Sequence, residues 1–197
     1  DAPAARLDQV VMYSLDATTA TLTKAGSART SAGAGPRHMK FSKDGQYAYV
    51  LTELHLNVAV YNRNPENGLL GKARQEISCL PANGNSEGMS CSEIRVHPSG
   101  KFIYAANRDV QGEGRDSISV FKVLEAGRIK RIQTIPARVE IPRNIGVDPE
   151  GRWLLVAGQK SGNVPVFQIT GDGTLKKTEN EVKVANAMCI EFLDPED

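Results

Sequence analysis

The feature that most constrains the fold is a paired pattern of short apolar runs that recurs along the chain. Each copy holds an apolar run, a polar turn with glycine, and a second run rich in aromatic and β-branched residues. The copies are GPRHMKFSKDGQYAYVLTE from Gly35, SEIRVHPSGKFIYAANR from Ser92 and PRNIGVDPEGRWLLVAGQ from Pro142. Two such runs joined by a turn of this kind are typical of a β-hairpin. The sequence therefore predicts one hairpin, repeated.

A second hairpin pattern follows each copy of the first, and a further version of it opens the chain. Its aligned aromatic residues are Tyr13, Tyr61, Phe121 and Phe167. They recur at roughly 45–60 residues, about the length of one four-stranded propeller blade. No helical periodicity is present. We therefore predict an all-β fold, a β-propeller of four-stranded antiparallel blades, with about three and a half to four blades in this chain.

The repeats also set the predicted limits of the blades. Complete blades are expected over residues 36–78, 92–135 and 142–183, and residues 7–24 supply the outer half of an incomplete blade. Residues 188–193 (MCIEFL) are predicted to form a lone strand of innermost character. A single domain over residues 1–197 then begins within one blade and ends on an unpartnered strand. We expect N-terminal blades of a longer protein, or a second copy of the chain, to complete the ring.

Composition narrows the partners and the compartment. Lys and Arg (24) nearly balance Asp and Glu (23), and the net charge of +1 is spread along the chain, which argues against a nucleic-acid partner. No apolar run approaches the roughly 20 residues that span a bilayer, so no membrane partner is expected. The cysteines Cys79, Cys91 and Cys189 fit neither a zinc site nor a disulfide framework. They favour a reducing compartment, so we expect a cytoplasmic protein, with a periplasmic or secreted location left open.

Antiparallel strand order sorts the polar residues by face. The start of a first strand and the end of a second strand lie at the same end of a hairpin, and the turns SKDG, HPSG and DPEG lie at the other. The residues expected at the shared end are Arg37, His38, Glu53, Glu93, Asn107, Arg108, Arg143, Gln159 and Lys160. They should converge on one mouth of the central channel. Polar side chains that converge on a concave surface predict a binding site.

The side chains expected at this mouth suggest a type of chemistry. Guanidinium groups suit the bidentate capture of phosphate or carboxylate, and imidazole suits general acid or base work near neutral pH. Together they indicate a small anionic substrate that undergoes proton transfer or attack by water. One histidine with two carboxylates (His38, Glu53, Glu93) is a weak metal signature, so neither a metal nor another cofactor is expected. Structural roles stay open, because Arg37 can bridge blades and Glu53 can pair with an arginine.

Several stretches resemble a known family. GPRHMKFSKDGQYAYVLTEL, SEIRVHPSGKFIYAANRD, DSISVFKV, IPRNIGVDPEGRWLLVAGQKSGNVPVFQI and MCIEFL are similar to the lactonase family of seven-bladed β-propellers, in order and in spacing. The resemblance covers about residues 8–193. The chain departs from the family in length, because about three blades on the N-terminal side are absent from it.

The resemblance implies hydrolysis, or reversible closure, of a lactone without a metal. By motif, the catalytic residues fall on His38, Glu93, Arg108 and Arg143, with substrate-binding roles for the other residues of the mouth. The expected substrate is a small anionic lactone, above all 6-phosphogluconolactone. Two alternatives stay open: lactonisation of a carboxy-muconate, and a non-catalytic propeller fragment that serves as a binding or assembly module.

Overall fold

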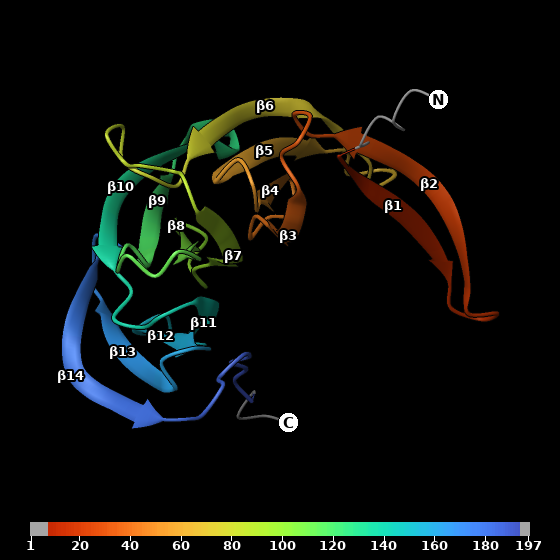
Figure 1. Ribbon diagram of the computed structural model, residues 1–197. Helices are drawn as coiled ribbons and strands as arrows, with labels where there is room; N and C mark the ends of the chain where they lie inside the picture. Colours follow the sequence, from red (N-terminus) through yellow and green to blue (C-terminus); the bar gives the residue numbers. More distant parts are fainter. Residues whose placement is uncertain (1–7, 194–197) are drawn as a thin grey trace.

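The strands of the protein form three four-stranded antiparallel sheets and one two-stranded sheet, as described by the computed structural model for residues 8–193. Figure 1 shows these sheets around an open arc, with β3, β7 and β11 nearest its centre. Each four-stranded sheet is a simple meander in which neighbours along the chain pair with one another. The all-β propeller predicted from the repeats is confirmed.

The bounds of the strands follow the repeats. The two-stranded sheet holds β1 (Gln9–Asp16) and β2 (Thr21–Arg29). The next sheet holds β3 (Pro36–Phe41), β4 (Tyr47–Thr52), β5 (Asn57–Arg63) and β6 (Leu70–Ser78). The third holds β7 (Met89–Val96), β8 (Phe102–Asp109), β9 (Ser117–Val123) and β10 (Ile129–Pro136). The last holds β11 (Pro142–Val147), β12 (Trp153–Gly158), β13 (Asn163–Ile169) and β14 (Leu175–Lys183).

The structure differs from the predicted blade limits at two places, residues 188–193 and the start of the blade predicted from residue 92. Residues 188–193 form no assigned strand, because a strand needs backbone hydrogen bonds to a neighbouring strand and this segment contacts the described sheets through side chains instead. The blade predicted to begin at residue 92 begins at Met89. The loop between β6 and β7 is therefore shorter than predicted. Residue 7 of the first predicted blade lies outside the described residues, as do the two ends of the predicted 1–197 domain. The single-domain assignment stays a prediction.

The core lies between the sheets rather than within one of them. One apolar cluster joins the sheets β3–β6 and β7–β10, and another joins β7–β10 and β11–β14. The aligned aromatics Tyr61, Phe121 and Phe167 are fully buried, whereas Tyr13 on the two-stranded sheet is 56% exposed. Stacked sheets bury their faces only against neighbours, so a hairpin without inner strands leaves its aromatic residue uncovered. No helix in residues 8–193 has the length and apolar character to cross a membrane.

A contact between a glycine of one sheet and an aromatic ring of the neighbouring sheet occurs twice, near the outer turns. Gly127, in a short 3₁₀ turn before β10, packs on the ring of Tyr47, and Gly173 before β14 packs on the ring of Phe102. A Cβ atom at either glycine would overlap the ring. The hydroxyl of Tyr104 also donates a hydrogen bond of 3.1 Å to the carbonyl of Gly173. The outer turn of one blade therefore rests on the second strand of the blade before it.

Replacing Gly173 by alanine is expected to destabilise the fold by about 2–5 kcal/mol. Gly173 has a φ of +83°, where a Cβ costs about 1–2 kcal/mol, and overpacking against Phe102 adds about 1–3 kcal/mol. The urea unfolding midpoint measures the loss. Gly171→Ala is the matched control in the same turn, because a Cβ there meets no atom within 4 Å. Equal midpoints for the two variants would contradict this account of the turn.

Candidate active site

Each innermost strand carries a β-bulge at the end that faces the mouth. The register shifts fall between Pro36 and His38 in β3, Cys91 and Ile94 in β7, and Pro142 and Asn144 in β11. A bulge adds one residue to a strand and re-aims the side chains beside it. As a result, His38, Glu93 and Asn144 occupy corresponding places on three neighbouring inner strands. This row of three residues is called the inner row below.

The inner row is joined by hydrogen bonds across the blades. Nδ1 of His38 lies 3.0 Å from Oε1 of Glu93, and Nδ2 of Asn144 donates to Oε2 of Glu93 at 2.6 Å. Oε1 of Glu93 also accepts from the backbone N–H of Ile94 at 2.9 Å. The side chain of Glu93 is 4% exposed and that of His38 is 40% exposed. A buried carboxylate therefore supports an imidazole that is open to solvent.

This geometry fixes the tautomer of His38. An ionised carboxylate only accepts hydrogen bonds, so the proton of the neutral imidazole sits on Nδ1, facing Glu93. Nη1 of Arg37 lies 3.2 Å from Nδ1 and 3.1 Å from Nε2, within hydrogen-bond distance of both ring nitrogens. The lone pair of the ring is then on Nε2, beside Nη1 of Arg37 at 3.1 Å. A carboxylate that orients a partly exposed imidazole is the arrangement of a general base.

Arginines surround the inner row. Arg108 forms an ion pair and a short hydrogen bond with Glu53, and Nε of Arg37 lies 3.7 Å from Oε2 of the same carboxylate. Arg37 also donates to the carbonyl of Ser92 on the next blade. Burial, together with the positive charges of Arg143 and Arg108, lowers the pKa of the Arg37 guanidinium. Such crowding of positive charge favours an anionic ligand at the mouth.

The predicted site residues divide into those that the structure gathers and those that it does not. Arg37, His38, Glu53, Glu93, Arg108 and Arg143 come together at the mouth. The side chain of Asn107 is fully buried and donates to the hydroxyls of Ser117 and Ser119, so it holds strands together instead.

The two predicted residues after β12 also lie apart from the cluster. Lys160 is 65% exposed and pairs with Glu140 at 2.9 Å, and Gln159 donates to the sulfur of Met188. The end of β12 lies at the mouth, as predicted, but the side chains of Gln159 and Lys160 contact residues outside the cluster. Arg37 and Glu53 bridge blades and also belong to the cluster, so their substrate-binding roles stay predictions.

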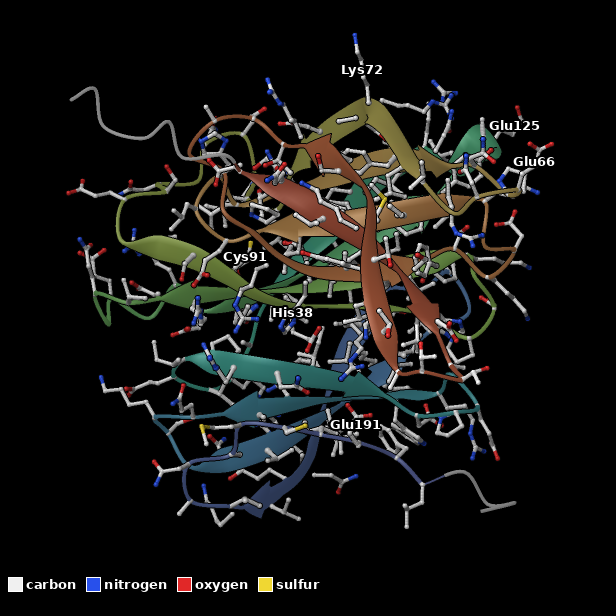
Figure 2. The ribbon with its side chains drawn as sticks, turned by 90° about the vertical axis from the view of Figure 1, so that its right-hand side faces the viewer. His38, Glu66, Lys72, Cys91, Glu125 and Glu191 are labelled. Carbon is white, nitrogen blue, oxygen red and sulfur yellow. The ribbon has the colours of Figure 1, made fainter. Side chains whose placement is uncertain are left out.

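Sequence reasoning missed two residues of the site. Asn144 directly follows Arg143, but the hairpin pattern does not predict its hydrogen bond to Glu93. Arg95 on β7 donates to the carbonyl of Ile145 at 2.9 Å and approaches Glu93 to 3.9 Å and Glu191 to 3.0 Å. Arg95 lies two residues after Glu93, and residues at this spacing share one face of a strand, so the sequence could have placed Arg95 beside Glu93. Figure 2 looks into the open side of the arc, where His38 and Glu191 lie near the middle.

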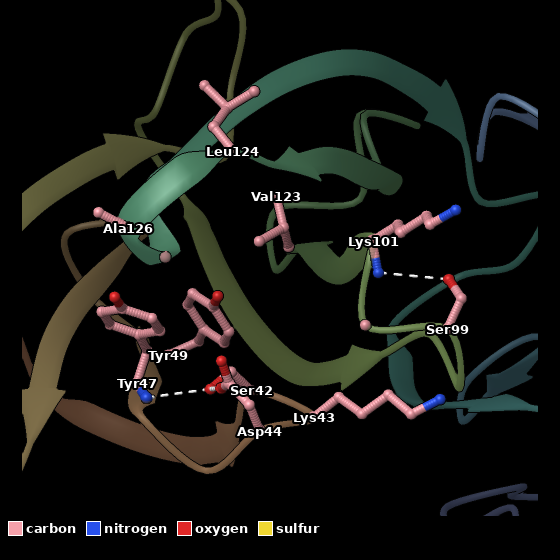
Figure 3. A pocket seen from close by; sticks show the side chains of 12 residues that line it. Ser42, Lys43, Asp44, Tyr47, Tyr49, Ser99, Lys101, Val123, Leu124 and Ala126 are labelled. Atoms are coloured by element: carbon pink, nitrogen blue, oxygen red, sulfur yellow. Dashed lines mark hydrogen bonds between the residues drawn. The ribbon is translucent and has the colours of Figure 1, made fainter.

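A cavity on the opposite face is less suited to catalysis. Its volume is about 460 Å³, and it lies between the β3–β4 and β7–β8 turns, with Tyr47, Tyr49 and Asp44 in its lining (Figure 3). Hydrogen bonds from Ser42 and Gln46 lower the pKa of Asp44 and tie it to the turn. Burial raises the pKa of Tyr49 to about 12. Neither group can exchange a proton readily near neutral pH, so the mouth is the candidate active site.

The fold and the mouth define the class of protein, a partial β-propeller with a cluster of charged side chains at one end of its inner strands. A family model described as the seven-bladed β-propeller lactonase matches residues 2–192. The chain belongs to this lactonase family of seven-bladed β-propellers. The family resemblance predicted from the sequence is confirmed.

Individual relatives agree with the family match. The chain is 33% identical over 191 residues to a 6-phosphogluconolactonase of Bacillus subtilis, a match covering 95% of this chain and 52% of the relative. It is 33% identical over 174 residues to a 6-phosphogluconolactonase of Formosa agariphila, covering 87% of this chain and 47% of the relative. A solved periplasmic gluconolactonase of Pseudomonas aeruginosa superposes with a TM-score of 0.84 at 29% identity, covering 95% of this chain and 51% of that one. The chain thus spans about half the length of these relatives.

Proposed function

We propose that this protein is a lactonase that hydrolyses a small anionic sugar lactone, 6-phosphogluconolactone above all, at the mouth that carries the inner row. The observation that carries the proposal is the contact of the exposed His38 imidazole with the buried Glu93 carboxylate, beside a group of arginines. Two relatives of 33% identity are named as 6-phosphogluconolactonases, which supports the same substrate class.

The proposed reaction uses His38 first as a base and then as an acid. Nε2 takes a proton from water while the water oxygen bonds to the lactone carbonyl carbon, and the carbonyl electron pair moves onto its oxygen. Arginine side chains stabilise this oxyanion, and Glu93 stabilises the imidazolium. The tetrahedral intermediate then collapses, the ring C–O bond breaks, and His38 returns the proton to the departing oxygen as a hydroxyl. The carboxylic acid formed releases its own proton to solvent at neutral pH.

The arginines are assigned to the anionic part of the substrate. Arg37 and Arg143 stand at corresponding bulges of β3 and β11, so the two guanidinium groups flank the inner row from different blades. Arg108 is held by Glu53 and by the carbonyl of Cys91 at 3.1 Å. Its firm placement suits stabilisation of charge that develops during the reaction, and the less restrained Arg143 suits capture of a phosphate.

Compartment and assembly remain predictions. The buried cysteines Cys79 and Cys91 support a cytoplasmic location, whereas one similar solved structure is of a periplasmic gluconolactonase. Ring completion, by further blades or by a second copy of the chain, is proposed because the arc of blades is open in Figure 1.

Acid release from 6-phosphoglucono-δ-lactone at pH 7, corrected for spontaneous opening, tests the proposed function. We expect a rate above background, with kcat/KM higher than for neutral glucono-δ-lactone. If the chain alone is inactive, the same assay on a form with three upstream blades restored tests whether an incomplete channel is the cause. Background rates from both forms would refute the proposed function.

Replacing Arg143 by glutamine is expected to raise KM for the phosphorylated lactone by about tenfold or more, because a charge-assisted hydrogen bond is worth about 1.5–3 kcal/mol. KM for the neutral lactone should change by less than about twofold. Parallel saturation curves for both lactones measure the difference. Arg152→Gln is the control, since Arg152 pairs with Glu150 in the turn at the opposite face. Equal effects of R143Q on both lactones would contradict the assigned role.

A further inference from the structure

Asn144 stands at the junction between the inner row and the C-terminal segment. Its side chain lies on β11, is largely buried, and makes two hydrogen bonds in opposite directions. Nδ2 donates to Oε2 of Glu93 at 2.6 Å, and Oδ1 accepts from the backbone N–H of Ile190 at 3.1 Å. The amide therefore connects a backbone group outside the sheets to the carboxylate that supports His38.

The chemistry of the two partners fixes which way this amide points. A backbone N–H only donates, so the oxygen of Asn144 must face Ile190. The amino group must then face Glu93, which as a carboxylate only accepts. The hydrogen bond to Ile190 therefore selects the amide orientation that supplies Glu93 with a donor. In the reverse orientation two donors would face each other at Ile190 and two acceptors at Glu93.

The C-terminal segment is held in place by further contacts. Gly146 lies on β11 two residues beyond Asn144, and a Cβ there would come within 2.5 Å of Cγ2 of Ile190. The bare backbone of Gly146 thus lets the segment lie against the strand. Glu191 pairs with Arg95 at 3.0 Å, and Arg95 in turn donates to the carbonyl of Ile145. Residues 188–193 form no strand, yet they are anchored where they can orient Asn144.

We propose that Asn144 is a positioning residue of the active site, oriented by the backbone of Ile190, which holds Glu93 so that His38 keeps its proton on Nδ1. The expected effect on kcat rests on the proposed function, whereas the expected effect on the His38 tautomer does not. Glu93 receives Ile94 N–H and His38 on Oε1, and Asn144 on Oε2. Loss of the Oε2 donor frees the carboxylate to turn away from His38.

The Asn144→Asp variant tests the proposal by changing one of the two contacts. Aspartate can still accept from Ile190 but, when ionised, cannot donate to Glu93. We expect kcat to fall about 10- to 100-fold with KM changed by less than about twofold, as for a misplaced catalytic group. Asn180→Asp, on the exposed face of β14, is the matched control and should leave kcat unchanged.

Imidazole ¹⁵N chemical shifts provide a readout that needs no activity. In the wild-type protein the His38 signal, assigned by its absence from the His38→Gln variant, should report a proton on Nδ1. In Asn144→Asp, and in Asn144→Ala should the first variant not fold, a mixture of the two tautomers is expected. Wild-type shifts in a folded variant would overturn the proposal, whether or not the protein hydrolyses a lactone. Failure of the proposed function alone would instead show as inactivity with the expected change in tautomer.

Discussion

Replacing His38 by glutamine is expected to lower kcat for 6-phosphoglucono-δ-lactone by about 10²–10⁴-fold, the contribution typical of a positioned general base. Glutamine retains a hydrogen-bonding group for Glu93 but offers no basic nitrogen to water. KM should change little, because the arginines assigned to the anion are retained. The initial rate of acid release at saturating lactone, corrected for spontaneous opening, measures the effect.

The control for this variant is His55→Gln. His55 lies exposed just after β4 and outside the cluster, so its replacement should leave kcat within about twofold of the wild-type value. Circular dichroism and the urea midpoint of both variants establish that the fold is retained. A His38→Gln protein that keeps kcat within about threefold of wild type would remove His38 from the mechanism.

The second large effect is expected for Glu93→Gln. The carboxylate accepts from three donors, His38, the Ile94 N–H and Asn144, whereas an amide offers one oxygen and a donor of its own. At least one buried donor then loses its partner, which costs about 1–3 kcal/mol of stability. The variant also removes the negative charge that stabilises the His38 imidazolium, so kcat should fall by about 10²–10⁴-fold.

Rates and stability are both needed to interpret the Glu93 variant. The urea midpoint separates loss of fold from loss of catalysis, and kcat is measured at a temperature well below the unfolding transition. Glu179→Gln, on the exposed β14, is the matched control for removal of a carboxylate and should change neither quantity. A Glu93→Gln protein with lowered stability but unchanged kcat would assign Glu93 a purely structural role.

The repeats predicted the fold closely because the period of the pattern carries the information. Aromatic residues such as Tyr61 and Phe121 recur once per blade, since each fills the same place between two sheets. Residues 188–193 have the composition of an inner strand, but pairing depends on a neighbour that the described chain does not provide. Composition can therefore indicate the character of a strand without deciding whether it is paired.

The site was predicted less completely, because strand order locates a backbone but not the direction of a side chain. Asn107 and Arg108 are adjacent on β8 and point to opposite faces, so only Arg108 reaches the mouth. The bulges in β3, β7 and β11 re-aim His38, Glu93 and Asn144, and the hairpin pattern alone does not reveal them. Asn144 in particular gains its role from a contact with Ile190, 46 residues away.

The central claim is that His38 and Glu93 act as one unit on the lactone, and the double variant His38→Gln/Glu93→Gln tests it most directly. Residues that act as a unit have strongly non-additive effects on rate. We predict that the kcat of the double variant equals that of His38→Gln alone, because Glu93 has no base left to orient. Losses that multiply, so that the double variant falls by the product of the two single effects, would contradict the account.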